Sequence, residues 1–177
     1  MLRKILYFSF LMGLFNTSAQ AEFQETIYTG IQVAQVTYED DFTGIEAEPS
    51  ALVLRIGGYL EGGTGIEARL GFGLSGYGDT VNVPGFGDVD FDVENFFGLY
   101  GLYHIGWGSN ASLYGLLGVT NGEIKISPNP GFITDRETSL SYGIGLNIAK
   151  INFEYVHYMH NNDFDWTAIS IGYVSKF

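Results

Sequence analysis

The last fourteen residues, 164–177, constrain the fold most, because they alternate in character and stop on an aromatic residue. Side chains along a β-strand alternate between two faces. One face would carry Thr167, Ile169, Ile171, Tyr173 and Phe177, and the other Ala168, Ser170, Gly172 and Lys176. A chain that stops inside a strand leaves an open edge, which soluble proteins usually cover or charge. The pattern predicts that this strand pairs with the first strand and closes a barrel.

Further short segments with the same alternation occupy most of the chain. The sequence predicts eight strands, at residues 27–38, 50–60, 64–75, 92–106, 111–121, 138–148, 151–160 and 164–177. Short connections fall at 61–63, 107–110 and 149–150, and longer ones at 39–49, 76–91, 122–137 and 161–163. Short turns at one end and longer loops at the other are typical of an up-and-down transmembrane barrel.

The C-terminal segments resemble a known signal. Alternating residues that end in phenylalanine are similar to the terminal assembly signal of bacterial outer-membrane β-barrels. Phe153-Glu-Tyr155, Ser170-Ile-Gly-Tyr173 and Lys176-Phe177 resemble the last hairpin of the small OmpA/OmpX-like barrel superfamily, with a departure at Ser175, where a large apolar residue is commoner. The resemblance implies an all-β fold, an eight-stranded antiparallel barrel in the outer membrane of a Gram-negative bacterium. It also implies that the assembly machinery of that membrane recognises Ile169, Ile171, Tyr173 and Phe177.

The N-terminus has the composition of a secretory signal peptide. Met1-Leu-Arg-Lys4 is basic, residues 5–15 are apolar, and Ala19-Gln-Ala21 supplies small residues at a cleavage site. The apolar run is too short to span a bilayer as a helix. We expect residues 1–21 to be removed and residues 22–177 to form one barrel domain that begins at Glu22.

Composition narrows the classes of partner. The chain has 177 residues, is 46% hydrophobic and carries a formal net charge of −12. A chain with this apolar content is not a disordered low-complexity protein. A nucleic-acid partner is excluded because the chain is strongly acidic. There is no cysteine, and a closed barrel satisfies its backbone without disulfides. We expect a monomer without a cofactor, in contact with outer-membrane lipids and lipopolysaccharide, whose surface ligand the sequence does not name.

Residues 138–148 alternate most regularly. Leu140, Tyr142, Ile144, Leu146 and Ile148 share one face, and Ser139, Ser141, Gly143, Gly145 and Asn147 the other. An eight-stranded barrel has an interior just wide enough for side chains, so this small face predicts room for large residues from the next strand. A two-residue Ala149-Lys150 turn places Gly145 opposite Glu154 and Ser141 opposite Tyr158. Ala-Lys is a poor two-residue turn, and a four-residue turn is the alternative.

Arg55, Glu67, Arg69 and Glu154 fall on the faces opposite the apolar ones and are the predicted interior charges. Charges in a tight interior must be paired and hydrogen-bonded. They therefore predict a polar network that plugs the barrel, with side chains lining a narrow aqueous gap as the alternative. A loop at residues 62–64 is favoured over one at 61–63, because the latter sets the two arginines directly opposite each other. Residues 27–38, 92–106 and 111–121 alternate too weakly for their faces to be assigned.

The longer connections are acidic. Their carboxylates include Glu39, Asp40, Asp41, Glu46, Glu48, Asp88, Asp90, Asp92 and Glu94. The last four recur at every second residue, so an extended segment would present them on one face. An EF-hand is excluded, because Val93 stands where that loop requires glycine and Leu99 where it requires glutamate. The default expectation is a solvated acidic surface, and divalent cations bridging to lipopolysaccharide phosphates are the alternative.

Two histidines test an enzymatic alternative. Lipid A deacylases are eight-stranded barrels with a histidine, a serine two residues later and a glutamate near the end of the chain. In this sequence, the residue two positions after His157 is Met159, and the residue two positions after His160 is Asn162, which precedes the acidic Asp163. The serine nucleophile is therefore missing. Histidines three apart in a regular strand also point to opposite faces, which argues against a metal site.

The sequence therefore favours a non-enzymatic barrel with a structural, surface-interaction or adhesion role through its acidic loops. A lipid A-modifying enzyme would need a nucleophile that the pattern does not reveal. A pore is disfavoured by the small number of strands. A soluble lipocalin-like barrel would keep its apolar faces inside, whereas these faces are predicted to lie outside.

Overall fold

The computed structural model describes residues 26–40, 44–83, 87–107, 110–128, 131–160 and 164–177. The predicted signal peptide and Asp41, Asn162 and Asp163 lie outside these residues. Within the described ranges, no helix is long and apolar enough to cross a membrane.

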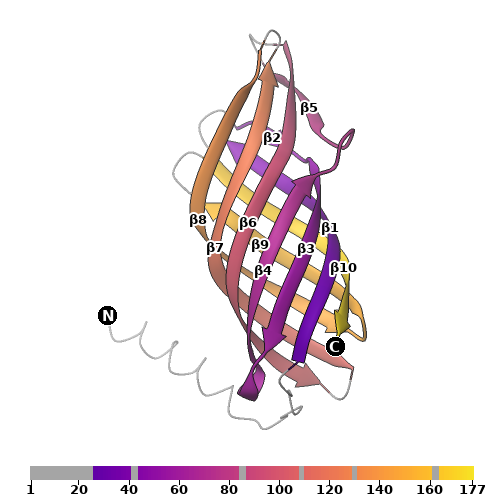
Figure 1. The fold of residues 1–177 in the computed structure, drawn as a ribbon. Coiled ribbons are helices and arrows are strands. Elements are labelled where there is room, and N and C mark those ends of the chain that lie inside the picture. Colours follow the sequence, from indigo (N-terminus) through magenta and orange to yellow (C-terminus); the bar gives the residue numbers. More distant parts are fainter. Residues whose placement is uncertain (1–25, 41–43, 84–86, 108–109, 129–130, 161–163) are drawn as a thin grey trace, which may run out of the picture.

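Antiparallel strands form a closed ring, as predicted. In the described part of the chain, the eight ring strands are β1 (Thr26–Asp40), β3 (Ser50–Tyr59), β4 (Thr64–Gly73), β6 (Gly87–Trp107), β7 (Ala111–Pro128), β8 (Ile133–Ile148), β9 (Ile151–His160) and β10 (Phe164–Lys176). Short strands β2 (Glu46–Ala47) and β5 (Asp79–Val83) pair with β1 and β6. The ring closes where β10 pairs with β1, from Tyr28 opposite Lys176 to Asp40 opposite Phe164 (Figure 1).

The two faces of the ring differ as the alternation predicts. Ile56, Ile144 and Ile169 point outward and are 57%, 62% and 68% exposed, whereas Ser141 and Trp166 point inward and are fully buried. The exposed set continues around the ring as a belt of large apolar side chains. Water-soluble proteins rarely expose apolar surface on this scale, so the belt matches a hydrocarbon environment.

Strands β6, β7 and β8 extend past the ring at the end opposite the C-terminus, which we call the upper end (Figure 1). The predicted loop at 122–137 is therefore largely wrong, because β7 continues to Pro128, β8 begins at Ile133, and their ladder reaches Ile126 opposite Ile133. Exposed Thr134 and Asp135 succeed each other here. On β8, polar residues fall on both faces, so this side of the extension lacks the alternation by which strands were recognised. On β7, Ile124 and Ile126 do alternate with Glu123 and Lys125, so the missed part of β7 had a strand pattern.

The turn between β3 and β4 overturns one prediction. A 3-10 turn at Glu61–Gly63 (η2) joins the strands, and Arg55 lies directly opposite Arg69. The favoured 62–64 loop was wrong because Gly62 and Gly63 both have positive φ angles, 74° and 82°. Glycine adopts this conformation without steric cost, so the backbone decides the register.

The turn between β8 and β9 has two residues. Ile148 pairs with Ile151, and Gly145 lies opposite Glu154 as predicted. Ala149 has a φ angle of 54°, which is unusual for a residue with a side chain. A Cβ atom at Gly145 would overlap the ring of Tyr114, so this glycine makes room for a large residue of the preceding strand, β7, and not of the next strand as predicted.

A β-bulge in β9 resets its alternation. His157 pairs with Thr167 of β10, and Met159 pairs with Trp166, so β9 contains one extra residue over this interval. Tyr158 and Met159 are both buried, and His157 and His160 consequently share the outer face. The expectation that the two histidines face opposite ways was therefore wrong. An extra residue shifts the phase of a strand, and Tyr158 and Met159 both occupy the apolar interior.

The bulge also changes how β8 contacts β9. Within the described residues, their backbone ladder ends at Tyr142 opposite His157. Above this pair, the Ser141 hydroxyl donates to the Tyr158 carbonyl over 2.7 Å. The Ser139 hydroxyl accepts from the His160 N–H and donates to its carbonyl, each over 3.2 Å. Side chains thus join the strands where backbone pairing stops.

Candidate functional site

The four predicted interior charges meet inside the ring. Glu67 accepts hydrogen bonds from Arg55 Nη2 at 2.6 Å and from Arg69 Nε at 2.5 Å. Glu154, from the far wall, accepts from Arg69 through both carboxylate oxygens at 2.6 and 2.7 Å. Side-chain exposures of 0–2% mean that these groups fill the interior. The network interleaves two cations with two anions.

Neutral groups complete this network. The hydroxyl of Tyr28 donates to Glu67 over 2.6 Å, and that of Tyr114 donates to Glu154 over 2.5 Å. Asn152 accepts from Gln32 over 2.5 Å and from Arg55 over 2.8 Å. A buried charge is tolerated when its partners satisfy it. The arrangement supports a structural plug, since its charged groups are already bonded to one another.

An apolar layer lies above the plug. Phe96, Tyr158, Met159 and Trp166 are buried there, with ring centroids of Phe96 and Trp166 5.8 Å apart. A Cβ atom at Gly122 would overlap Met159 and Trp166, so this glycine lets both side chains reach the wall. Sequence analysis missed the layer, although extending the alternation of 167–177 back by one residue places Trp166 inside.

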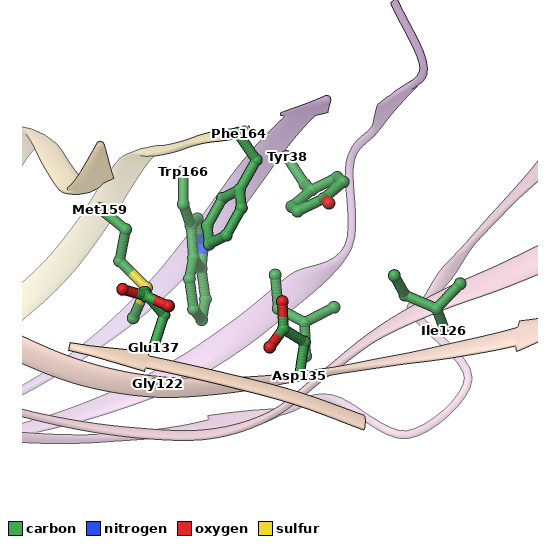
Figure 2. Close-up of a pocket in the computed structure, with 9 residues that line it drawn as sticks. Tyr38, Gly122, Ile126, Asp135, Glu137, Met159, Phe164 and Trp166 are labelled. Atoms are coloured by element: carbon green, nitrogen blue, oxygen red, sulfur yellow. The ribbon is translucent and has the colours of Figure 1, made fainter. Parts of the chain in front are cut away.

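Two pockets lie at the upper end, and only the smaller one is lined by residues of this layer, Met159 and Trp166. Figure 2 shows the narrower one, with Trp166, Phe164 and Tyr38 on one side and the carboxylates of Asp135 and Glu137 on the other. Its volume of about 10 Å³ admits at most one water molecule. The wider pocket, about 200 Å³, shares Tyr38 and Ile126 with it. Its lining also includes Asp40, Ile45, Val83, Val89, Phe91 and Pro128.

One polar atom in this layer lacks a partner. Within the described part of the chain, the indole Nε1–H of Trp166 is buried without a hydrogen-bond acceptor. A buried donor left unsatisfied costs about 1–3 kcal/mol. The two apolar pockets, with carboxylates at their edges, suit a ligand that offers an apolar group and a positive charge.

The predicted acidic residues lie around the upper end. Glu39 and Asp40 end β1, and Asp88, Asp90 and Asp92 lie in β6 on the face opposite buried Val89, Phe91 and Val93. Asp88 and Asp90 accept hydrogen bonds from Asn82 and Thr80 of β5, over 2.8 and 2.7 Å. Their carboxylates therefore point away from the pockets, whereas Asp40, Asp135 and Glu137 border them.

The residues of the predicted assembly signal lie along the outer face of β10. Ile169, Ile171, Tyr173 and Phe177 are all exposed. The Phe177 N–H donates to the carbonyl of Ile27 over 2.9 Å. The C-terminal residue is thus hydrogen-bonded to the first strand, and its side chain remains accessible on the belt.

A histidine cluster lies just above the apolar belt, where β9 meets β10. His157 Nε2 lies 3.2 Å from Asp165 Oδ1, and His160 Nδ1 hydrogen-bonds the same oxygen. The Tyr142 hydroxyl hydrogen-bonds His157 Nδ1 over 2.8 Å. Tyr142 and Asp165 thus take up both ring nitrogens of His157, so this histidine is not paired with a serine.

A closed ring of antiparallel strands, apolar outside and charged but hydrogen-bonded inside, defines a transmembrane β-barrel. The family model described as outer membrane protein beta-barrel domain matches residues 8–177. The chain belongs to this family, whose place is the bacterial outer membrane.

Solved structures of small outer-membrane barrels share the fold. The attachment invasion locus protein Ail of Yersinia pestis, in complex with the heparin analogue sucrose octasulfate, is 20% identical, with a TM-score of 0.61 over 87% of this chain and 99% of Ail. Neisserial surface protein A is 13% identical, with a TM-score of 0.62 over 85% of this chain and 97% of that protein. A search of curated proteins found no match. At these identities the likeness establishes the fold.

Proposed function

We propose that this barrel is a non-enzymatic surface-interaction protein whose upper end binds a basic, partly apolar peptide segment of another molecule. Barrels of this class place short turns in the periplasm and longer loops outside the cell. The short η2 and Ala149-Lys150 turns lie at the lower end, which puts the extended strands and both pockets outside. The protein would then meet partners through this end and contact lipid and lipopolysaccharide along its sides as a monomer.

The observation that carries the proposal is the pair of apolar pockets bordered by Asp40, Asp135 and Glu137. Carboxylates attract a basic partner and raise its association rate. Burial of an apolar side chain in the wider pocket would supply affinity at about 25 cal/mol per Å².

The charge of the upper end separates this barrel from a glycan binder. Ail was solved with a heparin analogue, which is polyanionic. The acidic surface of this chain, with a formal net charge of −12, would repel such a ligand. A sulfated glycan therefore serves as the negative control for binding.

Binding can be measured with the barrel in lipid nanodiscs. The probe is a fluorescent peptide of alternating lysine and leucine, compared with a serine-glycine peptide and with sucrose octasulfate. We expect binding of the first probe alone, weakened at least tenfold in the double variant Asp135→Asn/Glu137→Gln. Asp88→Asn/Asp90→Asn removes the same charge on the face away from the pockets and should change affinity less than threefold. Equal losses in the two variants would mean that net charge, not the pockets, selects the partner.

An enzymatic role is testable separately. Among the described residues, Tyr142 and Asp165 contact the two ring nitrogens of His157, which supports a role other than activation of a serine nucleophile. We expect no deacylated product when purified barrel is incubated with lipid A. Product formation that His157→Ala abolishes would replace the surface-interaction proposal with lipid A modification.

A further inference from the structure

We propose that His157, His160 and Asp165 form a binding site for one transition-metal ion of the Zn²⁺ type on the outer wall of the barrel. One ligand atom from each residue lies within 4.8 Å of the others. Two imidazole nitrogens and one carboxylate oxygen are a common donor set for zinc and neighbouring metals. Among the described residues, this is the one cluster of at least three potential ligands that could hold a metal ion.

The β-bulge builds the site. In a regular strand, residues 157 and 160 point to opposite faces. The extra residue between the pairs His157–Thr167 and Met159–Trp166 turns both imidazoles outward. The same shift brings His160 opposite Asp165 across the β9–β10 ladder. Bulges commonly re-aim side chains near functional sites, and this one gathers three ligands from two strands.

Metal binding would rearrange ligand atoms that already lie within 4.8 Å of one another. With metal bonds of about 2.0–2.2 Å, tetrahedral ligand atoms lie roughly 3.3 Å apart. His157 Nε2 and Asp165 Oδ1 are already separated by 3.2 Å. The histidine N–H groups now aim at one carboxylate oxygen, and a metal ion would replace those protons between the same three groups. The fourth position would be open to water.

Tyr142 completes the site from β8. Its hydroxyl lies 2.8 Å from His157 Nδ1, the nitrogen not aimed at Asp165. Such a contact fixes the orientation of a metal-binding histidine and its tautomer. With a metal on Nε2, Nδ1 would carry the proton and donate to the tyrosine oxygen. Tyr142 is therefore a positioning residue.

Hard cations fit the site poorly. Ca²⁺ takes six to eight oxygen ligands and Mg²⁺ prefers carboxylate and water, whereas two of the three ligands here are imidazoles. The proposal thus differs from cation bridging by the acidic surface, which would favour Ca²⁺ and Mg²⁺. It is also independent of the pockets, because His157 and His160 lie outside the lining of both.

Calorimetric titration of the tag-free full barrel in detergent tests the proposal, and the low background helps, since the chain has three histidines and no cysteine. We expect one Zn²⁺ per barrel and at least tenfold selectivity over Ca²⁺. His157→Ala and Asp165→Asn should each weaken Zn²⁺ binding at least tenfold, and Tyr142→Phe less. Asp88→Asn/Asp90→Asn, with exposed carboxylates elsewhere, should bind like the parent.

Two further measurements keep the proposal testable if a variant fails to fold. The parent titrated with Co²⁺ should develop visible absorption bands of a nitrogen- and oxygen-ligated ion, which Zn²⁺ displaces. Heat-dependent gel mobility reports whether each variant forms the barrel. Absence of stoichiometric Zn²⁺ binding by the folded parent, or unchanged binding by folded His157→Ala, would overturn the metal site.

Discussion

Arg55 and Arg69 lie directly opposite each other in the β3–β4 ladder, and the carboxylate of Glu67 accepts hydrogen bonds from both guanidinium groups. Like charges in this position normally destabilise a strand pair. Here Glu67 bridges them from β4, and Glu154 binds Arg69 from β9. The stabilising unit is therefore the network of four charges that ties opposite walls of the barrel.

Glu154→Gln should destabilise the barrel by about 3–5 kcal/mol, because it leaves a buried arginine charge uncompensated. Urea unfolding in detergent micelles measures the loss. Glu94→Gln is the matched control, since Glu94 is exposed and lies 3.8 Å from exposed Lys125. Its effect should stay within about 0.5 kcal/mol. Equal effects of the two changes would contradict a network that carries stability.

Ile144→Lys should cost about 2–4 kcal/mol in bilayers, because it places a charge on the lipid-facing side of the wall. Thr134→Lys, on the same strand but in the extension past the ring, should be nearly neutral. Unfolding in phospholipid vesicles distinguishes them. If both cost the same, Ile144 does not face hydrocarbon.

Cysteine scanning across the bulge tests the phase of β9. Single cysteines at Met159 and His160 can be probed with a water-soluble thiol reagent, without background from native cysteine. We expect rapid labelling at 160 and protection at 159, because Met159 is 1% exposed and the His160 side chain 62%. The opposite result would restore a regular strand and remove the basis for the metal site.

In planar bilayers the purified barrel should conduct little. Its interior is filled by the charged network and by buried aromatic rings, including Phe96, Tyr158 and Trp166. An eight-stranded barrel with such a filling leaves no aqueous channel. Large, stable and reproducible channels from the protein, recorded beside a sixteen-stranded porin as a positive control, would contradict this filling.

The exported protein should begin at Glu22, because Ala19-Gln-Ala21 supplies a cleavage site after a short apolar run. Intact-mass spectrometry of protein from the outer-membrane fraction measures the N-terminus. A mass that includes Met1 to Ala21 would show that the segment is retained. Ala21→Pro in the precursor is expected to block cleavage and provides the reference mass.

The strand count and barrel closure follow from the sequence because one face of each membrane-crossing strand must be apolar. Residues 138–148 show this alternation most clearly, and the structure places Leu140 and Ile144 on the belt. The extension of β7 carries an alternation, Glu123-Ile124-Lys125-Ile126, that was overlooked. The extension of β8 could not be recognised this way. It stands outside the belt, so no single environment imposes an alternation on residues such as Thr134 and Asp135.

Local backbone conformation accounts for the other misses. The positive φ angles of Gly62 and Gly63 set the β3–β4 register. The opposed arginines are tolerated because Glu67 accepts hydrogen bonds from both. The bulge at Tyr158 and Met159 has no signature in a period-two pattern, since it interrupts that period. For this reason the sequence did not predict that the two histidines share a face. The interior charges lie on strands with regular alternation, so their meeting inside the barrel could be predicted.

The hydroxyl contacts of Ser139 and Ser141 mark a line in the described part of the barrel wall where backbone pairing stops. The β8–β9 ladder ends at Tyr142 opposite His157, and beyond it the two serines hold the backbone of Tyr158 and His160. Segments with fewer backbone hydrogen bonds open locally at lower free energy. Amide hydrogens of residues 158–160 should thus exchange with solvent before those of residues 151–156. Such local opening would uncover Met159 and Trp166 just above the apolar belt, while the charged network below stays closed.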